Sequence, residues 1–292
     1  MTDSKKYTLC EAPVCVGSPT QGTEEAYSYL LEHGVKKIFE KNAYFAFFTS
    51  ERTKKAELCD PRLIELETVV HVCKELLKNQ RRAFEKGTFP ITVGGDHSIV
   101  MSSVSALSEV AGAHNTAVIY IDGHTDINTE KTTITGRIHG MPLAETLGIC
   151  TELLDIGCKN KPALYGKNLY IIGAHSIDDA EYVIMKEHGV HLYTPEEVAR
   201  RGTDDITREV LRATEGKMIH LSFDVDSIDG SEFPSTGYAM SGGLPYKTVF
   251  SFLQSFISSG RLSSFDCVEY NPSLDKTGKD LEKLLDIFNL FE

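Results

Sequence analysis

Hydrophobic and polar residues form two alternating patterns along the chain. Short apolar runs bounded by turn residues predict strands, and the longer segments between them carry apolar residues at helical spacing. The runs 117–121 and 168–172 are largely apolar on both faces, which is typical of parallel strands covered by helices on two sides. The predicted strands are 7–16, 89–94, 116–122, 168–173, 190–193, 217–224 and 262–269. The predicted helices are 23–33, 61–87, 98–110, 178–189, 203–215, 246–259 and 278–291.

The regular alternation of strand and helix predicts an α/β fold. Its sheet should be doubly wound and mainly parallel, with helices on both faces. No repeat, low-complexity tract or interdomain linker interrupts residues 1–292, so we expect a single domain. Open sheets of this kind place their sites at the carboxyl ends of the strands. Polar clusters at those ends are therefore the first candidates for function.

Composition narrows the class of partner. The net charge is −12 and no long run carries a single sign, which argues against nucleic acid as a partner because phosphate binding needs basic stripes. No apolar run approaches the roughly 18 residues of a membrane span, and the polar first residues lack a signal-peptide pattern. The seven cysteines contain no CxxC pair, which disfavours a disulfide framework or a thiolate zinc site. We expect a cytoplasmic protein without a membrane partner.

Two clusters of possible metal ligands follow predicted strands. The first, 94–98 (GGDHS), places His97 after a glycine turn, where a lone histidine is more often a cap or a hydrogen-bonding residue than a ligand. The second offers Asp122, His124 and Asp126 at alternate positions, and an extended chain would point all three the same way. Three ionisable groups on one face would repel or lose solvation unless a cation held them together.

A third cluster follows the strand at 217–224. Asp224 and Asp226 share the same alternate spacing, and helix capping by one of them would leave the other unexplained. The three clusters supply two imidazoles and four carboxylates, too many ligands for one zinc ion and without a thiolate. Oxygen-rich ligation of this kind suits a pair of harder divalent ions and favours Mn²⁺. Such a pair can deprotonate a water near neutral pH, so the predicted chemistry is hydrolysis at an electrophilic carbon.

The three motifs, 94–98, 122–128 and 222–226, resemble the metal motifs of the arginase (ureohydrolase) family in order and separation. The resemblance runs from about residue 12 to 291. It implies a three-layer α/β sandwich, two Mn²⁺ ions with a bridging hydroxide as nucleophile, and a homotrimer or homohexamer. The implied metal ligands are His97, Asp122, His124, Asp126, Asp224 and Asp226.

The same resemblance implies catalytic roles for three residues. His139, in the segment IHGMP, matches a histidine that shuttles protons at the mouth of the site. Glu269, in CVEYNP, matches a glutamate that pairs with the substrate guanidinium, whose planar shape offers two parallel donors. Asp126 would accept a hydrogen bond from the hydroxide and then its proton.

The amino-acid end of the substrate distinguishes L-arginine from decarboxylated relatives. Asn128 and Thr135 fall at polar positions of a loop that resembles the family's α-carboxylate loop, and Arg137 adjoins them. Asp178 and Glu181 match the family's α-ammonium site. The resemblance therefore implies hydrolysis of L-arginine to L-ornithine and urea.

Three positions depart from the family pattern. Arg137 replaces an asparagine, the pair Tyr238-Ala239 replaces Thr-Pro, and the segment 228–230 lacks a proline. The first two leave a second hypothesis open, another ureohydrolase acting on a different guanidino or formimino substrate. A third hypothesis is a non-catalytic subunit, whose signature would be lost metal ligands.

Overall fold

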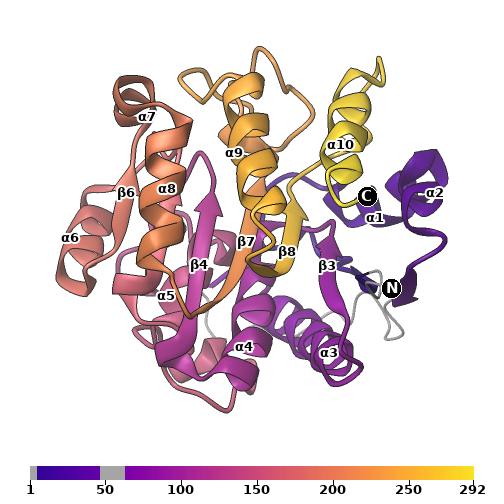
Figure 1. Ribbon diagram of the computed structural model, residues 1–292. Coiled ribbons are helices and arrows are strands. Elements are labelled where there is room, and N and C mark those ends of the chain that lie inside the picture. The colour runs from indigo at the N-terminus through magenta and orange to yellow at the C-terminus, as the bar shows by residue number, and fades with distance from the viewer. Residues whose placement is uncertain (1–4, 47–62) are drawn as a thin grey trace.

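A computed structural model describes residues 5–46 and 63–292. Within them the strands form one sheet with the order β2-β1-β3-β8-β7-β4-β5-β6, and every neighbouring pair is parallel. Figure 1 labels β3, β8, β7 and β4 in the middle of this sheet. The strands are β1 (Tyr7–Glu11), β2 (Ala43–Ala46), β3 (Phe89–Val93), β4 (Thr116–Ile121), β5 (Leu169–Ile172), β6 (His191–Tyr193), β7 (Met218–Asp224) and β8 (Leu262–Val268).

Helices cover both faces of this sheet. The α-helices are α1 (Ala26–Leu30), α2 (Lys36–Phe39), α3 (Leu66–Glu85), α4 (Val100–Ala111), α5 (Pro142–Thr146), α6 (Asp179–His188), α7 (Pro195–Arg201), α8 (Thr203–Ala213), α9 (Tyr246–Ser258) and α10 (Lys279–Asn289). Two apolar clusters pack α3, α4, α5 and α6 on one face, and a third packs α1, α2, α7, α8, α9 and α10 on the other. The predicted three-layer, doubly wound α/β fold is confirmed.

Strand β7 shows how the two layers differ. Ile219, Leu221 and Phe223 pack into the core on the α8–α9 side. The alternate residues His220, Ser222 and Asp224 are equally buried, but they face the α3–α4 side and carry polar groups. Polar side chains are therefore enclosed along this strand up to its carboxyl end.

The predicted elements agree with the structure except at a few places. All seven predicted strands are present, but the first ends at Glu11 rather than residue 16. The predicted helix 23–33 continues to Phe39, with a kink at Gly34 where φ is 145°. The predicted helix 61–87 begins at Leu66 among the described residues, and residues 61 and 62 lie outside them.

Strand β2 and the helices α5 and α7 were not predicted. Each is short, at four, five and seven residues, so none repeats a hydrophobic period often enough to stand out. None of the described helices has the length and apolar character needed to cross a membrane.

The strand order brings distant segments of the chain together. Strands β3, β8, β7 and β4 are consecutive in the middle of the sheet, and their carboxyl ends lie at one edge. Asp224 is the last residue of β7, and the segments after the other three strands carry His97, Glu269 and Asp122. This edge of the sheet is therefore where the predicted site residues can meet.

Candidate metal centre

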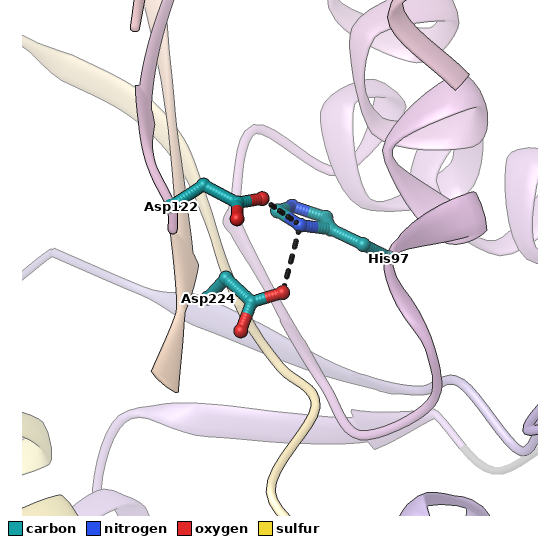
Figure 2. Close-up of side chains that lie close together, drawn as sticks. All are labelled: His97, Asp122 and Asp224. Atoms are coloured by element: carbon teal, nitrogen blue, oxygen red, sulfur yellow. Dashed lines mark ion pairs between the residues drawn. The ribbon is translucent and has the colours of Figure 1, made fainter. Parts of the chain in front are cut away.

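His97, Asp122 and Asp224 form a buried cluster at the carboxyl ends of β3, β4 and β7. The Nδ1 atom of His97 lies 2.8 Å from Asp122 Oδ2 and 3.0 Å from Asp224 Oδ2. Figure 2 shows the two carboxylates pointing from adjacent strands toward the imidazole that faces them. One nitrogen and two oxygens thus converge on a common point, with all three side chains buried.

A second cluster adjoins the first and shares Asp122 with it. The Nδ1 atom of His124 lies 3.0 Å from Asp226 Oδ2 and 3.6 Å from Asp122 Oδ1. In each cluster the possible ligand atoms lie within 4.8 Å of one another. Because the two oxygens of Asp122 face different clusters, this carboxylate is suited to bridge two ions. Asp126 is outside both clusters, although its Oδ2 atom lies 3.6 Å from His97 Nδ1.

The local conformation of these residues differs from the extended one that their alternate spacing predicted. Strand β4 ends at Ile121, and Asp126 has a φ of 45°, in the left-handed region that is rare for residues with a side chain. After Asp224 the chain enters a short 3₁₀ helix, η8 (Val225–Ser227). The carboxylates converge because the chain turns after each strand, so the prediction of extended geometry was wrong.

Asp224 performs two tasks at once. One carboxylate oxygen, Oδ1, accepts a hydrogen bond of 2.7 Å from the backbone N–H of Asp226 and caps η8. The other, Oδ2, faces His97. The sequence allowed helix capping as an alternative to metal binding, whereas the structure is compatible with both.

The electrostatics of the site favour a cation. Burial, followed by the nearby charge of Asp122, raises the pKa of Asp126 well above its ordinary value. Burial, followed by the charge of Asp226, does the same to the pKa of Asp224. Burial alone would also raise the pKa of Asp122, but the adjacent imidazoles of His124 and His97 outweigh it and lower that pKa. Holding these carboxylates ionised side by side is costly unless positive charge lies between them.

Unpaired atoms point to the same conclusion. Asp122 Oδ2 and His97 Nδ1 are both buried and lie 2.8 Å apart, but neither makes a hydrogen bond of normal geometry among the described residues. Buried polar atoms normally have a partner. The donor set contains imidazole and carboxylate groups and no thiolate, and it fits two divalent ions.

Two residues that hold His97 and Asp126 in place were not predicted from the sequence. The Tyr120 ring stacks on His97 at 4.3 Å between ring centroids, and its hydroxyl donates a 2.7 Å hydrogen bond to Asp126 Oδ2. Ser222 Oγ lies 2.8 Å from His97 Nε2, the ring nitrogen that faces away from the cluster. Both residues lie two positions before a cluster aspartate on the same face of a strand. Strand periodicity could therefore have identified them.

The turn after β3 requires glycine. Gly95 has a φ of 83°, and a Cβ atom at this position would lie 2.5 Å from the carbonyl oxygen of Ala12. The next residue, Asp96, is fully buried and accepts hydrogen bonds from the backbone N–H groups of Gly17 and Ser98. The turn is thereby closed against the segment after β1, and it presents His97 to the carboxylates.

Glu269 and His139 lie beside the two clusters. One oxygen of Glu269, Oε1, accepts a 3.1 Å hydrogen bond from the His97 backbone N–H and lies 3.3 Å from His139 Nδ1. The other oxygen, Oε2, is buried without a partner among the described residues. The backbone of Glu269 is left-handed, with a φ of 63°. Burial, followed by the charge of Asp96, raises the pKa of Glu269, and burial lowers the pKa of His139 to about 4.

Two of the residues predicted to bind the amino-acid end of the substrate are in contact. The side-chain amide of Asn128 donates a 3.0 Å hydrogen bond to Asp178 Oδ2, which places both beside the loop after β4. Glu181 is buried, and its two oxygens accept hydrogen bonds from the backbone N–H groups of Ile127 and Asp178. The structure thus gives Glu181 a role in fastening this loop to α6.

A family model described as "Arginase family" matches residues 5–284. The chain belongs to the arginase family. It is accordingly a hydrolase, an arginase-type amidinohydrolase that acts on the C–N bonds of linear amidines.

Individual arginases resemble the chain over most of its length. A protein named arginase from Bacillus subtilis (strain 168) is 35% identical over 233 residues, covering 78% of this chain and 77% of that protein. The solved structure of native arginase from Bacillus caldovelox matches with a TM-score of 0.90 at 27% identity, covering 98% of each chain. The structure of Entamoeba histolytica arginase in complex with L-ornithine matches with a TM-score of 0.89 at 26% identity, covering 99% of each.

Three further residues lie at the rim of the site. Thr135 and Arg137 were predicted to bind the substrate, and Tyr238 departs from the arginase pattern. Thr135 is exposed, and its hydroxyl accepts a 3.2 Å hydrogen bond from the backbone N–H of Arg137. The Arg137 guanidinium donates a 2.9 Å hydrogen bond to the carbonyl of Ser18. Tyr238 lies between the imidazoles of His124 and His139, with ring centroids 5.6 and 5.5 Å away.

Proposed function

We propose that the protein hydrolyses L-arginine to L-ornithine and urea and that it requires two Mn²⁺ ions. The observation that carries this proposal is the position of Glu269. Its carboxylate is buried next to both metal-ligand clusters, with one oxygen lacking a partner among the described residues. A buried carboxylate of this kind needs a cationic partner, and a guanidinium supplies one with two donors.

The arrangement of donor atoms supports two metal positions. His97, Asp122 and Asp224 would hold one ion, and His124, Asp122 and Asp226 the other, with Asp126 next to the first. A pair of divalent ions there supplies hydroxide near neutral pH by lowering the pKa of water. Ligation by oxygen and imidazole without thiolate favours Mn²⁺ over softer ions. Because all six predicted ligands are present, the signature of a non-catalytic relative is absent from the sequence.

The residues of the chain then perform the remaining tasks. Glu269 orients the guanidinium so that its carbon faces the two metal positions. Asp126 would accept the proton released when hydroxide forms a bond to the guanidinium carbon, and the hydroxyl of Tyr120 holds the Asp126 carboxylate in place by a hydrogen bond. As the bond from the guanidinium carbon to the Nε atom of arginine breaks, this proton passes to that nitrogen, which leaves as the side-chain amine of ornithine. The products are L-ornithine and urea, and the atoms of arginine and water are conserved.

His139 is suited to carry the next proton away from the site. Its Nδ1 atom faces Glu269, and its side chain is 16% exposed, so the ring contacts both the interior and the rim. A neutral imidazole can accept a proton from an incoming water and release it to solvent. We expect His139→Asn to slow turnover while metal content stays unchanged, and an unaltered rate would remove this role.

The loops after β4 and β5 support an amino-acid substrate. Asn128 and Thr135 offer donors for an α-carboxylate, and Arg137 adds a positive charge near it. Asp178 offers a carboxylate for an α-ammonium group, and Glu181 holds the loop that carries these residues. A related arginase has been solved with L-ornithine, the product expected here. Agmatine lacks the carboxylate that this loop would bind.

The proposal includes the organisation of the protein. We infer a single catalytic domain over residues 1–292, a homotrimer or homohexamer, and a cytoplasmic enzyme whose partner is a small guanidinium molecule. Light scattering on the eluting protein would test the assembly directly, because a monomeric mass would contradict it.

A urea assay tests the reaction. The protein is stripped of metal, reloaded with Mn²⁺ and given L-arginine or agmatine in parallel. Urea from L-arginine alone, dependent on Mn²⁺, is the expected result. If the protein binds two metal ions but releases no urea, the proposal fails. The second candidate, a different guanidino or formimino substrate, then gains support from the departures at Arg137 and Tyr238.

A further inference from the structure

The loop that carries Tyr238 is held firmly at its base. Backbone hydrogen bonds of 2.8 Å join Asp229 to Leu244 and Gly230 to Met240. A carboxylate oxygen of Asp229 also accepts a 2.8 Å hydrogen bond from the backbone N–H of Gly242. These bonds connect the two ends of the loop at three points.

The segment just before Tyr238 is fixed as well. Ser235 accepts a 2.9 Å backbone hydrogen bond from Asn271, two residues after Glu269. A Cβ atom on Gly237 would lie 3.1 Å from the Cβ atom of Thr20, so this part of the loop packs closely against the segment after β1. The backbone on both sides of Tyr238 is therefore held by contacts within the fold.

The Tyr238 ring forms an aromatic wall beside the catalytic groups. It meets the His124 ring edge-on, with 74° between the planes, and lies at a shallower 31° to the ring of His139. After burial, the charges that act on its phenol come from His124 and Arg137 and, with opposite sign, from Glu269 and Asp126. Tyr238 is only partly buried, so part of the side chain remains accessible to another group.

A guanidinium has the chemistry that this wall recognises. It is planar, weakly hydrated and permanently charged. Its N–H groups pair with a carboxylate, and its flat face stacks on an aromatic ring. Glu269 can pair with the edge of the cation but contributes nothing to its face. We propose that Tyr238 is a specificity-determining residue that binds the face of the substrate guanidinium and selects a planar cation over a neutral isostere. This inference rests on the proposed guanidinium substrate.

The test compares two small probes of nearly the same shape. Methylguanidinium carries the charge, whereas methylurea is neutral. Their affinities for the full chain loaded with Mn²⁺ are measured by calorimetry, for the unmodified protein and for Tyr238→Leu and Tyr238→Phe. Tyr44→Leu is a matched control, because Tyr44 is half exposed and lies near Lys86, at the amino end of β3, away from the site.

We expect Tyr238→Leu to weaken methylguanidinium binding by about 3- to 30-fold, the range of cation–π interactions, and to leave methylurea binding almost unchanged. Tyr238→Phe, which keeps the ring, should stay within about twofold of the unmodified protein. Equal losses for both probes would show that Tyr238 only packs the site, and this would overturn the inference. An unchanged methylguanidinium affinity in Tyr238→Leu would overturn it too.

The urea assay separates this inference from the proposed function. If L-arginine yields urea and Tyr238→Leu binds methylguanidinium normally, the reaction stands and the inference is wrong. If no urea appears but methylguanidinium binding depends on the ring, guanidinium recognition stands and the choice of L-arginine is wrong. If the unmodified protein binds no methylguanidinium and releases no urea, both are wrong.

Discussion

Tyr120 illustrates how single residues outside the metal ligands shape the site. It points from β4 toward the α3–α4 side, stacks on His97 and donates its hydroxyl to Asp126. One aromatic side chain thus restrains two groups, the His97 imidazole of the first ligand cluster and the carboxylate of Asp126, the proposed proton acceptor. Hydrogen bonds from neutral donors to charged groups contribute about 1.5–3 kcal/mol, more than ordinary ones.

We predict that Tyr120→Phe lowers turnover about tenfold, because Asp126 loses its donor while the stacking on His97 remains. Steady-state kinetics and metal analysis of the same preparations give the measurement. Tyr170→Phe, in the neighbouring strand β5, is the control, since it removes a hydroxyl from a buried tyrosine outside the site. Equal activity of Tyr120→Phe and the unmodified protein would contradict the prediction.

A second residue-scale prediction concerns Glu145 on α5. Burial, followed by the charge of Asp155, raises the pKa of Glu145 from 4.5 to about 8, and its Oε2 atom has no partner among the described residues. Between these values the folded protein keeps a proton that the unfolded chain has lost. The contribution of this group to stability is therefore present at low pH and is lost as pH rises toward 8.

Glu145→Gln removes this titration. Between pH 5 and pH 8 the unmodified protein should lose at least about 1.4 kcal/mol more unfolding free energy than the variant, the value of one pKa unit. Urea denaturation at several pH values measures both curves. Parallel curves would show that Glu145 titrates normally.

At the scale of elements, α6 is joined to the loop after β4 by its own capping box. The Asp178 side chain accepts from the backbone of Glu181, and Glu181 accepts from the backbone N–H of Asp178. The second oxygen of Glu181 receives the N–H of Ile127 at 3.1 Å. The start of a helix and a loop that bears site residues are thus held by one buried carboxylate.

We predict that Glu181→Ala lowers the unfolding free energy by about 2–4 kcal/mol, because two backbone N–H groups lose their acceptor. It should also raise KM for L-arginine more than it lowers kcat, since the loop carries Asn128. Glu187→Ala, at an exposed position of the same helix, is the matched control. A loss of kcat at constant stability would instead indicate direct contact with the substrate.

At the scale of the molecule, the site links four central strands at one edge of the sheet. Its carboxylates repel one another, so a cation that binds only the folded chain should stabilise the whole protein. A ligand at one hundred times its Kd adds about 2.7 kcal/mol. The bound cation would stabilise the loops after β3, β4 and β7 together, because each of them carries ligand residues.

We predict that chelation of Mn²⁺ lowers Tm by roughly 5 °C or more, since each kcal/mol shifts Tm by about 2–4 °C in a chain near this size. Differential scanning calorimetry with and without metal gives the comparison. Asp226→Asn, which lacks one ligand, should show a smaller shift. The prediction fails if chelation leaves the Tm of the unmodified protein unchanged, or if it lowers the Tm of Asp226→Asn by the same amount.

Much of the fold could be predicted because burial on two faces leaves a clear pattern. The runs that became β4 and β5 are apolar throughout, so the parallel sheet and its helical layers followed directly. Strand β2 and the helices α5 and α7 could not be predicted, because elements this short repeat no period. The three aspartate- and histidine-bearing motifs stood out because each follows such a run.

The sequence by itself determined which residue types stand at the strand ends, and so the class of chemistry and the family. It could not determine which ends are neighbours, because strand order depends on contacts between segments far apart in the chain. Only the tertiary structure placed Glu269 beside His97, 172 positions apart. Only the structure showed that left-handed turns at Asp126 and Glu269 aim their carboxylates. The position of Tyr238 between two imidazoles likewise depends on the packing of its loop against the segment after β1. This is a long-range contact, which no local sequence pattern predicts.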